Sequence, residues 1–577
     1  MSDAAVLDKK GSAPFQYRWF AFGDLNGFFG VMFDNMTVLA FLAYILTSIF
    51  EMPADIVYTR IFPGTAFGVL VGDLVYTWLA FKQAQRQKKD VTAMPLGLDT
   101  PSTIGIAFTI LGPAFIGYKA AGLEPSAAAL QTWYVGMAAM FYCGLFKVAC
   151  AFFGNWLSKV IPAAGLMGSL AGVGIALLGV VPIIEIMNAP LVGLVAMGLV
   201  FYNMVAKIRL PFNAPGVLIS VILGTILYYA FGPVCLAGQQ FQTPSAVTIG
   251  FSLPLPTLGF IAGLADAVNY LPVIIPFAIL TVVGGINVTE SARLAGDNYN
   301  TKEILLVDAC STIFAGLCGA VAQTTPYIGQ PAFKKMGCRS GYTVLTGVVV
   351  GLCGMLGIIQ FIVDAIPTAA LAPILCFVGL EIVSQAFACC PQAHFPAVAF
   401  AFIPNIARVM AIKGNYSDNG VFDNLLTTLA NEPGRYLSEK LLIPALGNGF
   451  ILTAMLWGAF FAFMIDRKLK KCSLFLFILA ALSLFGVIHS VNPSGFMYLP
   501  WHLPEVAQAV PYQFALGYFI LGLVVLALSF TKESHLSTEV EEDKEETAAL
   551  ETPSEAVAET EGAKVEENKA EEVAVKA

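Results

Sequence analysis

VTAMPLGLDTPSTIG (residues 91–105) and AQTTPYIGQPAF (residues 322–333) are the two stretches of this chain that most strongly constrain its structure. Each is a short apolar segment interrupted by Gly and Pro, with Thr, Ser, Asp or Gln at the interruption. Non-helical backbone at membrane depth survives only where protein or a water-filled cavity covers it. A matched pair of interrupted segments in the two halves of a chain is typical of a transporter binding site. We therefore expect two broken membrane helices whose tips meet around a ligand, and the alternative is two kinked helices with no ligand.

The composition around these stretches is that of an integral membrane protein. Of the 577 residues, 57% are hydrophobic and only 12% are charged, whereas soluble proteins carry about 25% charged residues. This excludes an ordinary soluble enzyme and a nucleic-acid binder. A spanning helix needs about 20 apolar residues, and we predict an all-α polytopic membrane protein with sixteen apolar segments. They are 20–50, 62–81, 100–116, 131–153, 160–184, 189–206, 214–232, 262–289, 303–322, 325–334, 342–363, 367–388, 395–412, 447–465, 472–490 and 512–530.

The charges are unevenly placed along the chain. The formal net charge is −8, yet residues 532–577 alone hold 15 acidic residues against 5 Lys, so we expect a disordered acidic tail there. The strong basic clusters all fall on the membrane side that holds the N-terminus, which is the cytoplasmic side by the positive-inside rule. Lys119, Arg408 and Lys413 are exceptions. We expect a multi-pass protein of the plasma (inner) membrane with both termini in the cytoplasm.

Asp34 is the candidate for ion coupling, and a pair of triplets beside it supports a duplicated architecture. Asp34 lies near the centre of the first apolar segment, and the triplet that follows it, 35–37 (Asn-Met-Thr), is echoed by 287–289 (Asn-Val-Thr). An ionisable residue inside a span is costly and is a functional hypothesis by default. We predict that Asp34, Asn35 and Asn287 handle H⁺ or Na⁺, the latter through hard oxygen ligands. The alternative for Asp34 is a structural role as a cap or in a helix–helix hydrogen bond.

The interruptions carry the predicted substrate contacts. The half-helix after each break presents free backbone N–H groups and a positive dipole end, which suit an anion or a carbonyl oxygen. Phe29 is a candidate for stacking on a planar ligand. The predicted substrate-binding residues are Asp99, Thr100, Ser102, Gln323, Thr324, Thr325, Tyr327 and Phe29. In contrast, we expect Asp73 and Asp308 to be buried hydrogen-bond anchors.

Four segments of the chain resemble the nucleobase–cation symporter group, the xanthine/uracil permease family. They are GTAFGVLVGD (64–73), IPFAILTVVG (275–284), ARLAG (292–296) and LLVDACSTIFAGLCGAVAQTTPYIG (305–329). The resemblance implies two inverted seven-span repeats, with short strands at spans 3 and 10 and the substrate between them.

The resemblance also implies how the chain divides. A cytoplasmic N-terminal segment (1–18) would precede the transport domain (19–466). That domain would comprise a core (19–155 and 258–365) and a gate (156–257 and 366–466). Two additional spans (467–531) and the acidic tail (532–577) would follow.

The same resemblance implies a function and one more site residue. Gly284 occupies the place of the family's nucleobase-gripping Glu, so we add Gly284 to the substrate-binding residues. Ile328 stands at the second Glu, and Phe28-Phe29 stand near a Gln-His pair. The implied function is cation-coupled uptake of a nucleobase-like or other small polar solute by alternating access. The alternatives are a small-anion transporter or exchanger, because the fold resembles that of sulfate and bicarbonate transporters, a membrane-embedded enzyme, or a channel.

Missing motifs narrow these alternatives. The chain contains no HExxH, GxSxG or GxxxxGK[ST] sequence, so we expect neither an enzyme nor a nucleotide-driven pump. The 11 Cys are scattered through apolar segments and the 4 His have no ligand spacing, so we expect no metal and no cofactor. The expected partners are a small-molecule substrate, H⁺ or Na⁺, and membrane lipid, with a homodimer left open and no nucleic acid.

Overall fold

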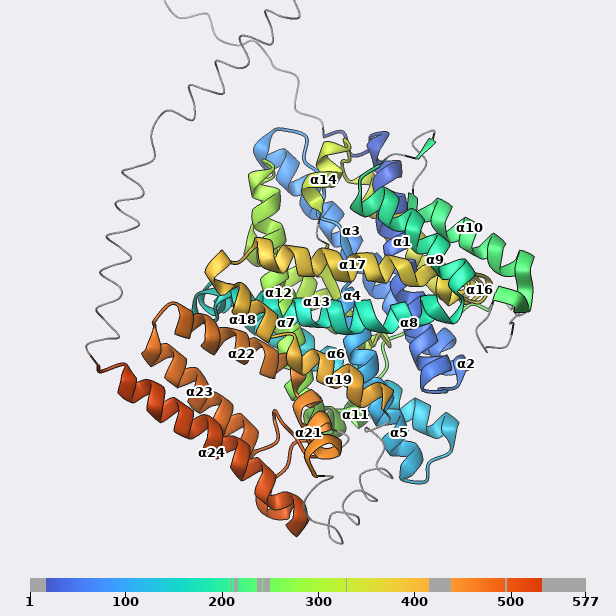
Figure 1. Cartoon of the computed structure of the whole chain (residues 1–577). Helices are drawn as coiled ribbons and strands as arrows, with labels where there is room; N and C mark the ends of the chain where they lie inside the picture. Colours follow the sequence, from blue (N-terminus) through green and yellow to red (C-terminus); the bar gives the residue numbers. More distant parts are fainter. Residues whose placement is uncertain are drawn as a thin grey trace, which may run out of the picture.

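The structure is a computed structural model, shown in Figure 1. It describes residues 17–208, 210–211, 216–235, 241, 250–327, 329–414, 437–492 and 495–531. The predicted acidic tail, most of the predicted N-terminal segment, and Ile328 lie outside the described residues.

The described part of the chain is helical and built to cross a membrane. Nine of its helices are long and apolar enough to span one: Gly23–Ile49, Ala54–Gln87, Thr100–Ala120, Pro125–Phe152, Ala163–Asn188, Gly259–Arg293, Thr368–Ala388, Gln392–Lys413 and Ala507–Leu528. A tenth forms if Leu441–Gly447 and Phe450–Ile465, which meet at a bend of 76°, count as one span. Three shorter apolar helices are Pro190–Val205, Gly216–Phe231 and Gly341–Met355. The prediction of an all-α polytopic membrane protein is confirmed.

Fewer helices than the sixteen predicted segments reach spanning length. The apolar segments coincide with helices, but several of these are short because Gly, Pro or a bend interrupts them. Examples are α13 (Thr301–Leu317, 17 residues) and α23 (Leu469–Leu484, 16 residues). Segment 325–334 forms only a strand and the six-residue helix α14 (Gln330–Lys335).

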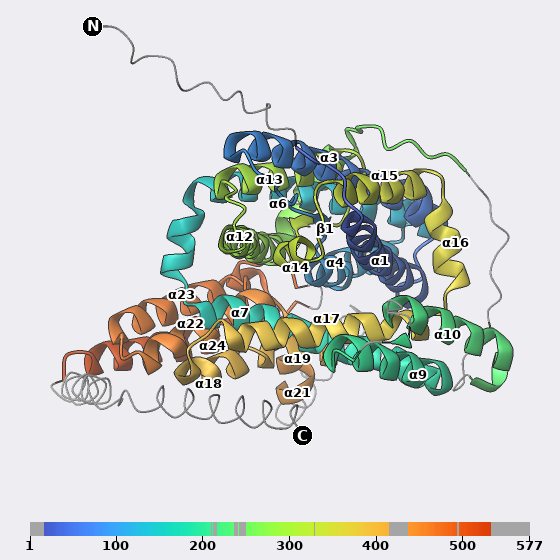
Figure 2. The same ribbon diagram turned by 90° about the horizontal axis from the view of Figure 1, so that it is seen from above.

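The helices form two layers, which Figure 2 shows from above. The first layer contains α1 (Gly23–Tyr44), α3 (Phe62–Gln87), α4 (Thr100–Ile106), α6 (Pro125–Val160), α12 (Leu271–Leu294), α13, α14 and α15 (Gly341–Met355). The second contains α7 (Ala163–Val173), α8 (Val181–Asn188), α9 (Pro190–Val200), α10 (Gly216–Phe231), α17 (Thr368–Ala388), α18 (Phe395–Phe400), α19 (Ile403–Lys413), α21 (Leu437–Gly447) and α22 (Phe450–Ile465). These sets follow the predicted core and gate ranges, whose roles remain predictions.

Two further helices form a hairpin at the edge of the second layer. They are α23 and α24 (Glu505–Leu528), which pack along each other and contact α22 and α21 (Figure 1). The hydroxyl of Ser473 donates a hydrogen bond of 2.8 Å to the carbonyl of Gly522 across this hairpin. These helices correspond to the two additional spans predicted for 467–531.

Two strands join the halves of the first layer. They are β1 (Leu96–Leu98) and β2 (Thr324–Pro326), which pair antiparallel with Gly97 opposite Thr325. The ladder extends on both sides, because Tyr327 N–H donates to Pro95 O and Asp99 N–H donates to Gln323 O, at 2.8 and 3.1 Å. Each strand follows a full helix and precedes a short one, so the order of elements repeats in the two halves while the strands run in opposite directions. The pairing also provides hydrogen-bond partners for backbone N–H and C=O groups that lie outside helices at membrane depth.

Candidate functional site

Asn35 attaches the first strand to the first helix. Its Oδ1 accepts a hydrogen bond of 2.9 Å from the N–H of Leu98, and its Nδ2 donates to Val31 O at 2.8 Å. The side chain is fully buried. Asn35 therefore fixes the position of β1 on α1, while its predicted part in ion coupling stays a prediction.

Asp34 presents a carboxylate oxygen without a partner beside the strand pair. Its Oδ2 is buried and has no hydrogen-bond partner among the described residues. The Tyr327 hydroxyl interacts with the same carboxyl group, and a Cβ added at Gly97 would lie 3.3 Å from the Tyr327 ring. A buried polar atom without a partner is costly, so this oxygen is a candidate acceptor for a proton or a cation.

Asp99 caps the helix that follows the first strand. Its Oδ2 accepts from the N–H of Ser102 at 3.0 Å, and its backbone carbonyl accepts from Thr103 N–H at 2.9 Å. The N-cap carboxylate therefore already holds one of the N–H groups at this end of α4, and the predicted binding role of the others stays a prediction. Thr100 is buried in the first turn of α4. A substrate at this end of α4 would meet the Asp99 side chain as well as the helix dipole.

Gln323 presents an unused donor immediately before the second strand. Its Oε1 accepts from Cys143 Sγ at 3.0 Å and from Thr281 Oγ1 at 3.4 Å. Its Nε2 is buried and has no partner in the described part of the chain. Thr324 and Thr325 follow in β2, the first buried and the second half-buried. Gln323 thus has an N–H group available for an acceptor.

Lys147 on α6 is a site residue that the sequence reasoning missed. Its side chain is fully buried, its Nζ lies 2.7 Å from Oδ2 of Asp308 on α13, and it also donates to Thr324 O at 2.9 Å. The signal was present, since a lone Lys within an apolar run needs a partner in another span. The expected anchor role of Asp308 is confirmed. That of Asp73 is also confirmed, because its Oδ1 accepts from Leu96 N–H at 3.0 Å.

Gly284 borders open space in α12, whereas its neighbour does not. A Cβ added at Gly284 would meet no atom within 4 Å, but one at Gly285 would lie 2.7 Å from Leu305 and 3.5 Å from Pro326 of β2. The helix therefore lies with Gly285 toward the strand pair. A larger side chain fits at Gly284 without moving the fold.

Two predicted site residues are not joined to the paired strands. The Phe29 side chain is 46% exposed, and its ring contacts those of Phe28 and Phe33. Asn287 lies in α12 with its side chain exposed. Their predicted roles remain predictions.

The ionisable side chains around the strand pair carry an excess of negative charge when all of them are ionised. The Lys147 and Asp308 charges compensate each other, which leaves the carboxyl groups of Asp34 and Asp99 beside the strand pair. An anion placed there is repelled unless one of these groups binds a proton or a metal cation. The arrangement can thus hold a small polar or anionic solute together with a cation.

Comparisons with known proteins place this geometry in context. The sequence model of the Sulfate permease family matches residues 175–395. No curated protein sequence matches the chain.

Among solved structures, the chain is similar to the transmembrane domain of a cyanobacterial bicarbonate transporter, BicA. The identity is 16%, the coverage is 69% of this chain and 99% of that chain, and the TM-score is 0.46. It is also similar to the murine anion transporter Slc26a9 in its inward-facing state, at 12% identity over 72% of this chain and 70% of that chain, with a TM-score of 0.45. A further structure of SLC26A9 shares 12% identity over 78% of this chain and 65% of that chain, with a TM-score of 0.49.

The family match corrects the assignment suggested by resemblance. It covers the segments 275–284, 292–296 and 305–329 that carried most of the likeness to the nucleobase–cation symporters, and it assigns them to a different family. The assignment to the xanthine/uracil permeases is therefore wrong, and the nucleobase uptake that it implied is not supported. Members of the matching family are transporters and not enzymes, as expected for this chain.

Proposed function

We propose that this protein is a secondary-active transporter of a small inorganic anion, of the size of sulfate or bicarbonate. The observation that carries the proposal is the antiparallel pairing of β1 with β2, which brings the two broken segments together beside Asp34. The match of residues 175–395 to the Sulfate permease family supports an anion as the substrate.

The substrate would lie against the paired strands, where Gln323 offers an unused N–H donor and Gly284 borders open space. The hydroxyl groups of Thr100 and Ser102 are the nearby neutral groups at the α4 end. Lys147 contributes a positive charge behind β2, but its direct partner is Asp308. This set of donors suits oxyanion oxygens better than an apolar solute.

A cation would travel with the anion. Two carboxyl groups flank the strands, and the Oδ2 atom of Asp34 has no partner within the described residues. We propose that H⁺ or Na⁺ occupies Asp34 when the anion binds, because this removes the repulsion between them. Symport then follows from electrostatics, since each ion raises the affinity for the other by the same factor.

Alternating access would come from movement of one layer against the other. The strands, Asp34 and Lys147 all belong to the first layer (Figure 2). A rigid movement of this layer along the second would carry the site between the two membrane faces without disturbing the β1–β2 pairing. In this proposal the N-terminus and the basic loops face the cytoplasm.

Uptake into proteoliposomes tests the proposal. The purified full chain is reconstituted, and uptake of labelled sulfate and bicarbonate is measured with and without an imposed Na⁺ or pH gradient. We expect uptake above protein-free vesicles that a gradient accelerates and the other anion competes for. Uptake that only follows the anion's own gradient would identify a channel, and no anion uptake under any gradient would reject the proposal.

A further inference from the structure

Arg408 is a buried positive charge without a negative partner. Lys147 and Arg408 are the two cationic side chains classed as buried in the described part of the chain. Lys147 is paired with Asp308, but Arg408, which is 5% exposed, forms no ion pair with any described residue. An uncompensated charge in such a place is strongly destabilising. Its sequence position was also an exception to the distribution of basic residues.

The neighbours of Arg408 only partly satisfy its guanidinium group. Nη1 donates to Oδ1 of Asn448 at 3.2 Å, and Nη2 donates to the carbonyl of Phe108 at 3.1 Å. The Nε atom is buried and has no partner among the described residues. Both acceptors are neutral, so the positive charge of Arg408 is not compensated by any described residue.

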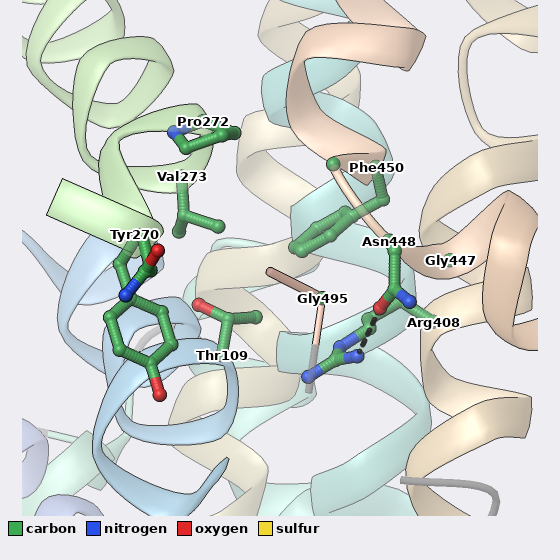
Figure 3. Close-up of a pocket in the computed structure, with 11 residues that line it drawn as sticks. Thr109, Tyr270, Pro272, Val273, Arg408, Gly447, Asn448, Phe450 and Gly495 are labelled. Atoms are coloured by element: carbon green, nitrogen blue, oxygen red, sulfur yellow. Dashed lines mark hydrogen bonds between the residues drawn. The ribbon is translucent and has the colours of Figure 1, made fainter. Parts of the chain in front are cut away.

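A small cavity adjoins this guanidinium group. Figure 3 shows the Arg408 guanidinium group among the lining residues, close to Gly495 and joined to Asn448 by the dashed hydrogen bond. Its volume is about 20 Å³, which is enough for one water-sized molecule or ion. No described Asp or Glu lines it.

The beginning of α22 lies at the same cavity. Gly449 and Phe450 are lining residues, and α22 is a 16-residue helix that starts there after the 76° bend. Gly449 adopts a left-handed conformation, with φ of 67°, and no described side chain caps the helix. The first N–H groups of a helix and its dipole favour an anion. The start of α22 and the Arg408 side chain therefore both place positive charge beside this small cavity.

We infer that this cavity is a binding site for a small monovalent inorganic anion such as a halide. The anion would lie beside the Arg408 guanidinium group, at the start of α22. A volume of about 20 Å³ suits a monatomic anion, so the expected ligand is smaller than that of the proposed transport site. The cavity also differs in place from that site, because it is not formed by the strands or by Asp34.

The site bridges the two layers. Phe108 lies in the π-helical turn η3 (Ala107–Leu111) of the first layer, whereas Arg408 and Phe450 belong to the second. Arg408 donates its hydrogen bond to Phe108 across this boundary, and the bound anion would compensate the positive charge of Arg408. Occupancy therefore stabilises the present arrangement of the layers, which goes beyond the proposed transport function.

Thermal unfolding of the full chain in detergent tests the site, with bromide replacing gluconate at constant ionic strength. We expect a saturable rise in Tm for the unmodified protein and loss of that rise in Arg408→Gln. Arg60→Gln is the matched control, because Arg60 is exposed over the Trp133 ring and loses the same charge. It should keep the full bromide response.

Two further measurements test the site even if Arg408→Gln fails to fold. Thr109→Asp places a carboxylate in the cavity, so we expect a folded protein whose Tm no longer responds to bromide. Crystals of the unmodified protein grown in bromide should show an anomalous peak beside the Arg408 guanidinium group. A bromide response that persists in Thr109→Asp, or a peak only at the strand pair, would overturn the inference.

Discussion

The ammonium group of Lys147 lies 2.7 Å from a carboxylate oxygen of Asp308, and both side chains are buried. The same ammonium group donates to the backbone carbonyl of Thr324 at 2.9 Å. A single charged group therefore joins α6, α13 and β2. The second strand is therefore held by this charged group as well as by its pairing with the first.

Lys147→Met should destabilise the protein strongly. Removing one partner of a buried ion pair leaves the other charge uncompensated, which costs about 3–5 kcal/mol. The double variant Lys147→Met/Asp308→Leu should recover most of this loss, because both charges are then absent. Thermal unfolding of the four proteins of the cycle measures the coupling. A double variant as unstable as Lys147→Met would contradict the ion-pair explanation.

Asp34→Asn should uncouple uptake from the cation gradient. The amide has a similar shape but neither ionises nor binds Na⁺ well, so uptake should lose its response to a Na⁺ or pH gradient while expression stays normal. Asp55→Asn is the control, because Asp55 is exposed on α2 (Ala54–Ile56) and loses the same charge. Gradient-driven uptake that is unchanged in Asp34→Asn would remove Asp34 from the mechanism.

The sequence predicted the helices and the paired interruptions because both depend on local signals. Apolar length fixes the spans, and Gly97 with Pro101 and Pro326 identifies where helix must stop. The details around the breaks are non-local. The capping role of Asp99 depends on how the chain turns into α4, and the Lys147 pair joins residues 161 positions apart. No local sequence pattern indicates contacts between residues so far apart in the chain.

The mistaken family assignment has a physical cause. Segments such as 275–284 are runs of small and apolar residues, which record helix packing and not the chemistry of a ligand. Gly284 was the residue that differed most clearly from the nucleobase family, because a glycine has no carboxylate to accept a hydrogen bond from a ring N–H. Ligand class depends on a few polar groups at the breaks.

Gly284→Leu should block uptake without unfolding the protein. Its Cβ would point into open space, so we expect little change in Tm but a loss of uptake of more than tenfold if this space holds the anion. Gly517→Leu on α24 is a matched control, since a Cβ there also meets no atom within 4 Å. It should transport normally. Normal uptake by Gly284→Leu would place the substrate elsewhere.

Asp466 should make stability depend on pH in the acid range. It lies just outside α22, where its Oδ1 is 2.6 Å from His394 Nε2 and its Oδ2 is 2.9 Å from Lys468 Nζ. Partial burial alone would raise the pKa of Asp466, but the hydrogen bonds and charges of Lys468 and His394 outweigh it, so the pKa is lowered.

A carboxyl group whose pKa is lower in the folded state than in the unfolded state binds fewer protons when folded. Its stabilising effect is therefore complete above the ordinary Asp value of about 4 and is lost as the pH falls through the lowered folded pKa. We expect Asp466→Asn to lower Tm at pH 6 and to approach the unmodified protein as the pH falls to about 3. The difference between the two Tm profiles isolates this group, because all other carboxyl groups are common to both. A difference that stays constant from pH 6 to 3 would show that the Asn substitution acts through packing and not through the charge of Asp466.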